Sequence, residues 1–203
     1  MKKIVLLVVA MAAVVAVWFG ISAWLDASRR HATVAERLGA ARLLAAEADR
    51  QSDARVELDR VVKLDPEHVE ARLLRARVLH ALALNGDAQA DLMAVMPKLD
   101  GDEKAHANLL LANVLVARYR GTLSDELFRL ARNAYGEAQR VTATRAEAQF
   151  GSAMLLLEKG PNRDLDKARS LLEQLVATAP DAPQAAEARE LLELLKPKDP
   201  AGG

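Results

Sequence analysis

The chain has 203 residues, no cysteine, and 28 basic against 28 acidic residues, so its formal net charge is zero. This balance argues against a general nucleic-acid binder, and the lack of cysteine excludes disulfides, thiolate chemistry and cysteine-based zinc sites. Aromatic residues make up only 3% of the chain. A core built from Leu, Val and Ala favours close-packed helices over a β-sheet.

The N-terminus carries an uncharged apolar run over residues 4–25, directly after Lys2 and Lys3. As a helix this run is about 33 Å long at roughly 1.5 Å per residue, which is enough to cross a hydrocarbon core. It is longer than the core of a signal peptide, which usually has about 7–15 residues. The sequence therefore predicts a retained transmembrane anchor over residues 1–28, with a cleaved signal peptide as the alternative.

The charges around the run predict its orientation. The short tail with Lys2 and Lys3 is similar to the start of a bacterial signal-anchor, which leaves the N-terminus inside. We therefore expect a single-pass inner-membrane protein with its body in the periplasm. A cytoplasmic body is the alternative, because Arg29 and Arg30 follow the run.

A stripe of small residues lies within the run, where Ala12, Ala16 and Gly20 recur at four-residue intervals. Small residues allow helices to approach closely in a membrane, so this stripe predicts contact with a partner transmembrane helix. The alternative is that alanine is simply common in apolar segments.

Residues 29–195 contain a repeated spacing of small and apolar side chains. A small residue is followed four positions later by a larger side chain, then three positions later by another apolar residue, and in two segments by proline. The segments are Ala54-Leu58-Val61-Pro66, Ala88-Leu92-Val95, Ala131-Tyr135-Ala138 and Ala168-Leu172-Leu175-Pro180. The first two alanines are 34 positions apart and the later intervals are longer, which indicates insertions around residues 117–124 and near Gly160.

This spacing resembles the second helix of the tetratricopeptide repeat family, whose period is 34 residues. The pairs Leu111-Ala112 and Phe150-Gly151 stand where the first helices of that family carry a large and a small residue. The family's usual Trp is missing. The resemblance implies an all-α solenoid of roughly four helical hairpins.

Local signals agree with hairpins. Asp53, Asp87 and Asp164 precede the expected second helices, where a carboxylate caps free backbone N–H groups, and Asp65 precedes Pro66 in the same way. A closing helix is expected over residues 182–195, and residues 196–203 are expected to form a flexible tail.

No chemical motif points to catalysis. The four histidines, His31, His68, His80 and His106, lack the four-residue spacing of a helical metal site, and no phosphate-binding loop or nucleophile elbow is present. We therefore expect no enzyme activity, no metal and no cofactor.

The remaining candidate is a binding surface. In the family register, first-helix side chains face an inner groove suited to a peptide or a partner helix. The residues that we predict for this first-helix groove are Arg77, His80, His106, Asn113, Arg145 and Ser152. A solvated face without a ligand is the alternative.

These features together predict a non-catalytic, membrane-anchored scaffold that binds protein partners during assembly of a bacterial envelope complex. Neither nucleic acid nor a small-molecule substrate is expected. A structural accessory subunit of a large respiratory, photosynthetic or secretory membrane complex is an alternative. The order of anchor and repeats is also similar to an accessory subunit of the protein-export channel and to the repeat subunit of cytochrome c maturation or haem-lyase systems.

Overall fold

The computed structural model describes residues 2–196, with side chains from Trp18 onward except at residues 20, 23 and 26. Over this range the chain forms nine α-helices, two short 3-10 helices and no strand. It divides into two compact units, Met1–Ala71 and Arg72–Gly203, and the boundary falls inside a helix. The helical part of the fold prediction is therefore confirmed for the described residues.

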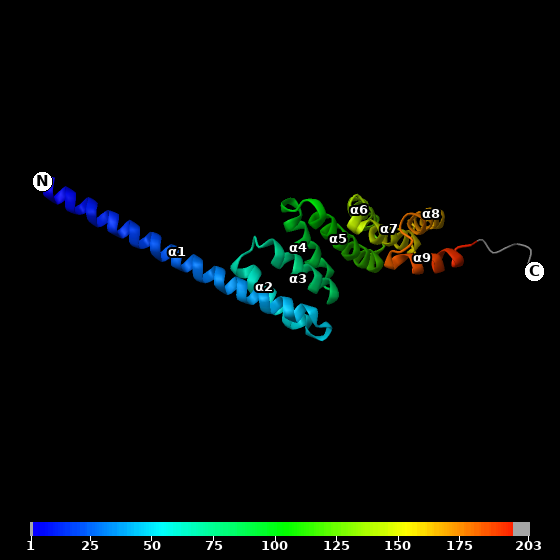
Figure 1. Ribbon diagram of the computed structural model, residues 1–203, viewed down its shortest axis with the longest axis horizontal. Helices are drawn as coiled ribbons and strands as arrows, with labels where there is room; N and C mark the ends of the chain where they lie inside the picture. Colours follow the sequence, from blue (N-terminus) through cyan, green and yellow to red (C-terminus); the bar gives the residue numbers. More distant parts are fainter. Residues whose placement is uncertain (1, 197–203) are drawn as a thin grey trace, which may run out of the picture. The chain divides into compact units, whose positions relative to one another are not determined.

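The predicted transmembrane anchor is corrected by the structure. Helix α1, Lys2–Ala46, runs without a break through the predicted end of the anchor at residue 28 (Figure 1). In the described part of the chain, no helix combines the length and the apolar character needed to cross a membrane.

The same finding overturns the predicted location as a single-pass inner-membrane protein with a periplasmic body. The predicted packing stripe of Ala12, Ala16 and Gly20 lies outside the side chains that the structure describes, as do residues 197–203 of the predicted tail.

The first unit contains a helical hairpin. The C-terminal part of α1 packs against α2, Gln51–Leu64. Val34, Leu38 and Ala41 of α1 are buried, and the predicted segment Ala54-Leu58-Val61 is fully buried in α2. Arg37 Nη1 donates to Glu57 Oε2 at 2.8 Å between the two helices.

The second unit is built from consecutive helices. Its helices are α3 (Val69–Ala81, which begins in the first unit), α4 (Asn85–Val95), α5 (Gly101–Thr122), α6 (Asp125–Ala138), α7 (Thr142–Leu157), α8 (Leu165–Thr178) and α9 (Pro183–Leu194). From α4 to α9 each helix packs on the next (Figure 1). The predicted insertion near residues 117–124 is the C-terminal end of the long helix α5.

Small side chains allow the helices of this unit to pack closely against one another. Ala88, Ala131 and Ala168 have no exposed surface. Gly151 on α7 lies directly against Tyr135 on α6, because a Cβ built on the glycine would be 2.5 Å from the tyrosine ring. The Tyr135 hydroxyl donates to Asn113 Oδ1 at 2.7 Å, which ties α6 to α5 as well.

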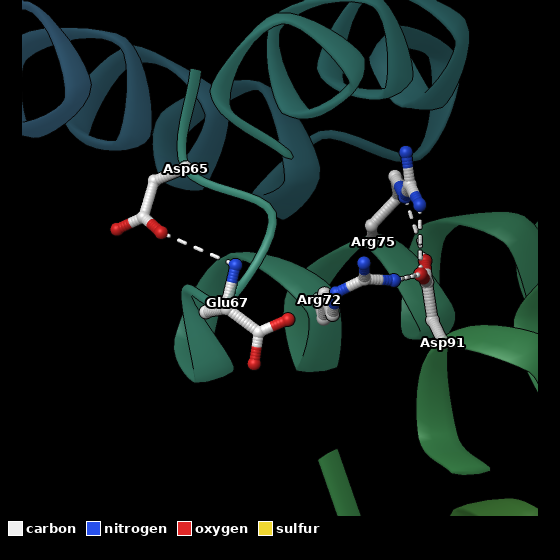
Figure 2. Close-up of polar contacts among 5 residues, drawn as sticks. All are labelled: Asp65, Glu67, Arg72, Arg75 and Asp91. Atoms are coloured by element: carbon white, nitrogen blue, oxygen red, sulfur yellow. Dashed lines mark hydrogen bonds and ion pairs between the residues drawn. The ribbon is translucent and has the colours of Figure 1, made fainter. Parts of the chain in front are cut away.

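A buried ion cluster joins α3 to α4 within the second unit (Figure 2). Asp91 is only 2% exposed, and both of its carboxylate oxygens accept hydrogen bonds. Arg75 donates to both oxygens, at 2.6 and 2.7 Å, while Arg72 Nη1 donates to Oδ1 at 2.7 Å. Paired in this way, the carboxylate is held inside the packed helices.

The predicted caps are confirmed at one position and corrected at three. Asp164 caps α8, because its side chain accepts from the backbone N–H of Lys167. Asp53 and Asp87 instead lie inside the first turns of α2 and α4, since each helix begins two residues earlier. Asp65 ends α2, and its Oδ1 accepts from the Glu67 N–H at 3.2 Å in the turn before α3 (Figure 2).

Candidate functional site

The residues of the predicted first-helix groove lie on three helices of the second unit. Arg77 and His80 are on α3, His106 and Asn113 on α5, and Arg145 and Ser152 on α7. The structure brings two of them together: Arg77 and His106 line one depression of about 220 Å³ with Leu73 and Leu110. Both are exposed.

All of the predicted residues except Arg77 take part in hydrogen bonds within the protein, and His106 Nδ1 lies 2.8 Å from the Asp102 carbonyl oxygen. His80 Nδ1 lies 2.7 Å from Asn85 Oδ1, and Asn113 accepts from Tyr135. Arg145 Nε donates to the Gln139 carbonyl at 3.2 Å. Ser152 is buried and accepts from the Gln139 side chain. These side chains, which were predicted to contact a partner, are therefore already hydrogen-bonded within the fold.

A larger depression of about 500 Å³ lies between α6 and α8, with α7 as its floor. We call it the α6–α8 depression. It is lined by Phe128, Arg132, Gly136, Gln139, Ser152, Leu155, Leu156, Asn162, Asp164, Lys167, Ser170 and Leu171. Only Ser152 among these belongs to the predicted groove, so most of this surface was not predicted.

The floor of the α6–α8 depression is mostly apolar and is held by packing and a hydrogen bond. Leu155 is 1% exposed and packs in the core. Gln139 Nε2 donates to Ser152 Oγ at 2.8 Å, which fixes both polar side chains at the floor. Phe128 also lines the depression and packs against Tyr119, with ring centroids 5.6 Å apart. A floor already held by packing and hydrogen bonds needs little ordering when a ligand binds.

The rim of the α6–α8 depression is polar. Lys167 Nζ pairs with Asp164 Oδ2 at 2.8 Å, so these two charges largely neutralise each other. Asn162 Nδ2 donates to Asp125 Oδ1 at 2.7 Å, which joins the α7–α8 loop to the start of α6. Arg132 is exposed and has no ion-pair or hydrogen-bond partner among residues 2–196 as described. The rim therefore presents one uncompensated positive charge beside an apolar floor.

Replacing Asp164 with asparagine tests the electrostatics of this rim. The Lys167 side chain and then its backbone N–H, both hydrogen-bonded to Asp164, hold the pKa of that carboxyl below its ordinary value of 3.8. A lowered pKa means that the carboxylate stabilises the fold above pH 3.8 and loses this effect as the pH falls through the folded-state pKa. Asparagine still caps the helix but does not titrate.

We expect the wild type to have the higher Tm at neutral pH, and the Tm difference between the two proteins to shrink below pH 3.8. Thermal unfolding of both proteins across this range is the measurement. A difference that stays constant at all pH values would show that the Asp164 charge contributes nothing to folding.

No protein-family model, curated protein or solved structure matches this chain. Within the described residues, no group of three His, Asp or Glu side chains is placed to hold a metal ion together. The function must therefore be argued from the surface of the helical unit itself.

Proposed function

We propose that the chain is a non-catalytic helical scaffold that holds a segment of a protein partner in the α6–α8 depression. The observation that carries this proposal is the joint presence of a buried apolar floor and the unpaired cation Arg132 on one concave surface. Clefts that combine an apolar lining with a few placed polar groups are the usual form of a binding site.

We propose further that the architecture is of the tetratricopeptide type. Supporting this, the repeated alanines at positions 54, 88, 131 and 168 are all fully buried. The close contact of Gly151 with Tyr135 also fits the packing expected of a large residue against a small one in neighbouring helices.

The charge of the rim specifies the partner. Because Asp164 and Lys167 pair with each other, Arg132 dominates the local field. The complementary ligand is a peptide segment with an acidic side chain next to a large apolar one. The apolar side chain would lie on Leu156 and Leu171, while the acidic one would approach Arg132.

A binding role also suits the polar groups on the floor. The hydroxyl of Ser152 is hydrogen-bonded to the amide of Gln139, and an amide does not accept a proton from a serine as a general base does. This pairing supports a scaffold over a hydrolase.

Selection from a displayed library of random peptides against the purified chain tests the proposal. We expect the selected peptides to share an acidic and a large apolar residue. Ser170→Trp should fill the depression and weaken their binding at least tenfold in calorimetric titrations. Glu173→Trp is the matched control, because Glu173 is an exposed residue of the same helix that does not line the depression.

Equal binding to the wild type and to Ser170→Trp would contradict the assigned site, provided that circular dichroism shows both variants folded. Failure to select any peptide above background would contradict the peptide-binding function.

A further inference from the structure

A second depression, of about 220 Å³, lies between α4 and α6 and is also lined by α5. We call it the α4–α6 depression. Successive residues of α6 line the two depressions. Arg132 and Gly136 line the α6–α8 depression, whereas Asn133 and Glu137 line the α4–α6 depression. The two are therefore separated by one helix, which has a diameter of about 10–12 Å.

The two depressions occupy equivalent positions in the repeat but differ in one charge. Gln89 directly follows the buried Ala88, as Arg132 directly follows the buried Ala131. Gln89 lines the α4–α6 depression and Arg132 lines the α6–α8 depression. A neutral amide thus stands in one depression where the other has a cation.

Helix α5 supplies the missing positive charge through Arg118. Arg118 Nη1 donates to Gln89 Oε1, and Arg118 lies one helical turn beyond Leu115, which lines the depression. In the part of the chain that the structure describes, this guanidinium has no carboxylate partner. The acidic lining residue Glu137 pairs with Arg140 Nη1 at 2.9 Å instead. The edge of the α4–α6 depression therefore keeps a net positive charge.

Large apolar side chains lie uncovered in the same depression. Met93 is 57% exposed and Leu130 is 40% exposed, while Leu111 and Leu115 line it as buried residues. An uncompensated cation beside apolar side chains is the combination that the α6–α8 depression presents as well. The chain therefore builds this surface twice, with the cation on α6 in one case and on α5 in the other.

We propose that the α4–α6 depression is a second docking point for the same partner, which carries two units that each join an acidic side chain to a large apolar one. One unit pairs with Arg132. The acidic side chain of the other pairs with Arg118, and its apolar side chain covers Met93 and Leu130. This inference rests on the proposed function and specifies the form of the partner, whose two units are spaced to cross α6.

Calorimetric titration with a selected peptide that carries one unit counts the docking points. We expect the wild type to bind two copies, the second at least tenfold more weakly, because the α4–α6 depression holds about 220 Å³ against about 500 Å³ for the other. Ser170→Trp should retain only the weaker copy, and Asn133→Trp, which fills the α4–α6 depression, only the tighter one. Glu126→Trp is the matched control, because Glu126 is an exposed residue of α6 that lines neither depression.

The role of Arg118 is measured in the Ser170→Trp background, where only the weaker copy remains. Arg118→Gln should weaken this copy at least fivefold, whereas Arg118→Lys keeps the charge and should bind within twofold of Arg118. Circular dichroism checks that each variant is folded. Equal binding by Arg118→Gln and by the parent would overturn the assignment of the second unit to Arg118.

A peptide with two units joined by about four Gly and Ser residues, which span roughly 10–12 Å on average, tests whether one partner reaches both points. It should bind the wild type at least tenfold more tightly than the single unit, and Asn133→Trp should abolish this gain. No gain on linking would overturn the inference. A single bound copy that Ser170→Trp abolishes would also overturn it and leave the proposed function intact, whereas a chain that binds no copy contradicts the proposed function itself.

Discussion

Replacing Asp91 with alanine is expected to lower the free energy of unfolding by about 3–5 kcal/mol, the range for removing one partner of a buried ion pair. The carboxylate is 2% exposed and receives three hydrogen bonds from Arg72 and Arg75. Without it, two guanidinium groups on α3 lose their buried counter-charge. Urea unfolding followed by circular dichroism measures the effect, and Tm should fall by on the order of 10 °C.

The matched control for this prediction is Asp87→Ala. Asp87 lies in the first turn of the same helix and is exposed, so its loss should cost no more than about 1 kcal/mol through the helix dipole. Equal effects of the two substitutions would show that the buried cluster does not hold α3 to α4.

Replacing Gly151 with alanine should destabilise the second unit by about 1–3 kcal/mol, the usual cost of overpacking a core. The added Cβ would lie 2.5 Å from the Tyr135 ring and 2.7 Å from its hydroxyl oxygen. The ring has little freedom to move, because Tyr135 is 3% exposed and its hydroxyl bonds to Asn113. Denaturant unfolding of the variant gives the cost directly.

The same substitution at Gly136 should have the opposite sign. Gly136 lies inside α6 with no atom within 4 Å of an added Cβ, so alanine should stabilise the helix by about 0.5–1 kcal/mol. In a Tyr135→Leu background, Gly151→Ala should cost less than in the wild type, since the clashing ring is gone. If Gly151→Ala is equally destabilising in both backgrounds, the Tyr135 ring is not the source of the destabilisation.

The positions of the core residues could be predicted from the sequence because packing imposes a period on it. The alanines at 54, 88, 131 and 168 were singled out by spacing alone, and all four are fully buried. The turn near Gly160 and the long α5 likewise follow from local signals and from the interval between repeats. The buried alanines, the turn near Gly160 and the length of α5 each depend on residue types at nearby positions, which the sequence shows directly.

The anchor was predicted from the apolar run alone, and the structure corrects it. The run favours a helix, which forms, but α1 continues as one helix to Ala46 through a charged segment. The described residues contain no helix that meets the requirements for crossing a membrane. The apolar run predicted a helix at the N-terminus, but it did not predict that this helix continues to Ala46.

The sequence did not predict which groups the polar side chains bind within the fold. The resemblance to the repeat family placed His80, Asn113 and Ser152 on first helices. It did not show that Asn85, Tyr135 and Gln139 would bind them inside the fold. Nor did it indicate that second helices would border the depressions. The spacing did contain a usable signal. The residues one and five positions after Ala88, and those one and five positions after Ala131, line depressions on the surface.

Charge exchange between Arg132 and the selected peptide is the decisive test of whether the α6–α8 depression binds an acidic segment. Calorimetric titration would compare the wild type and Arg132→Glu, each with the selected acidic peptide and with a version whose acidic residue is changed to lysine. We expect severalfold weaker binding in both mismatched combinations and recovery when both charges are reversed. Equal affinities in all four combinations would show that the α6–α8 depression does not bind an acidic segment of a partner through Arg132.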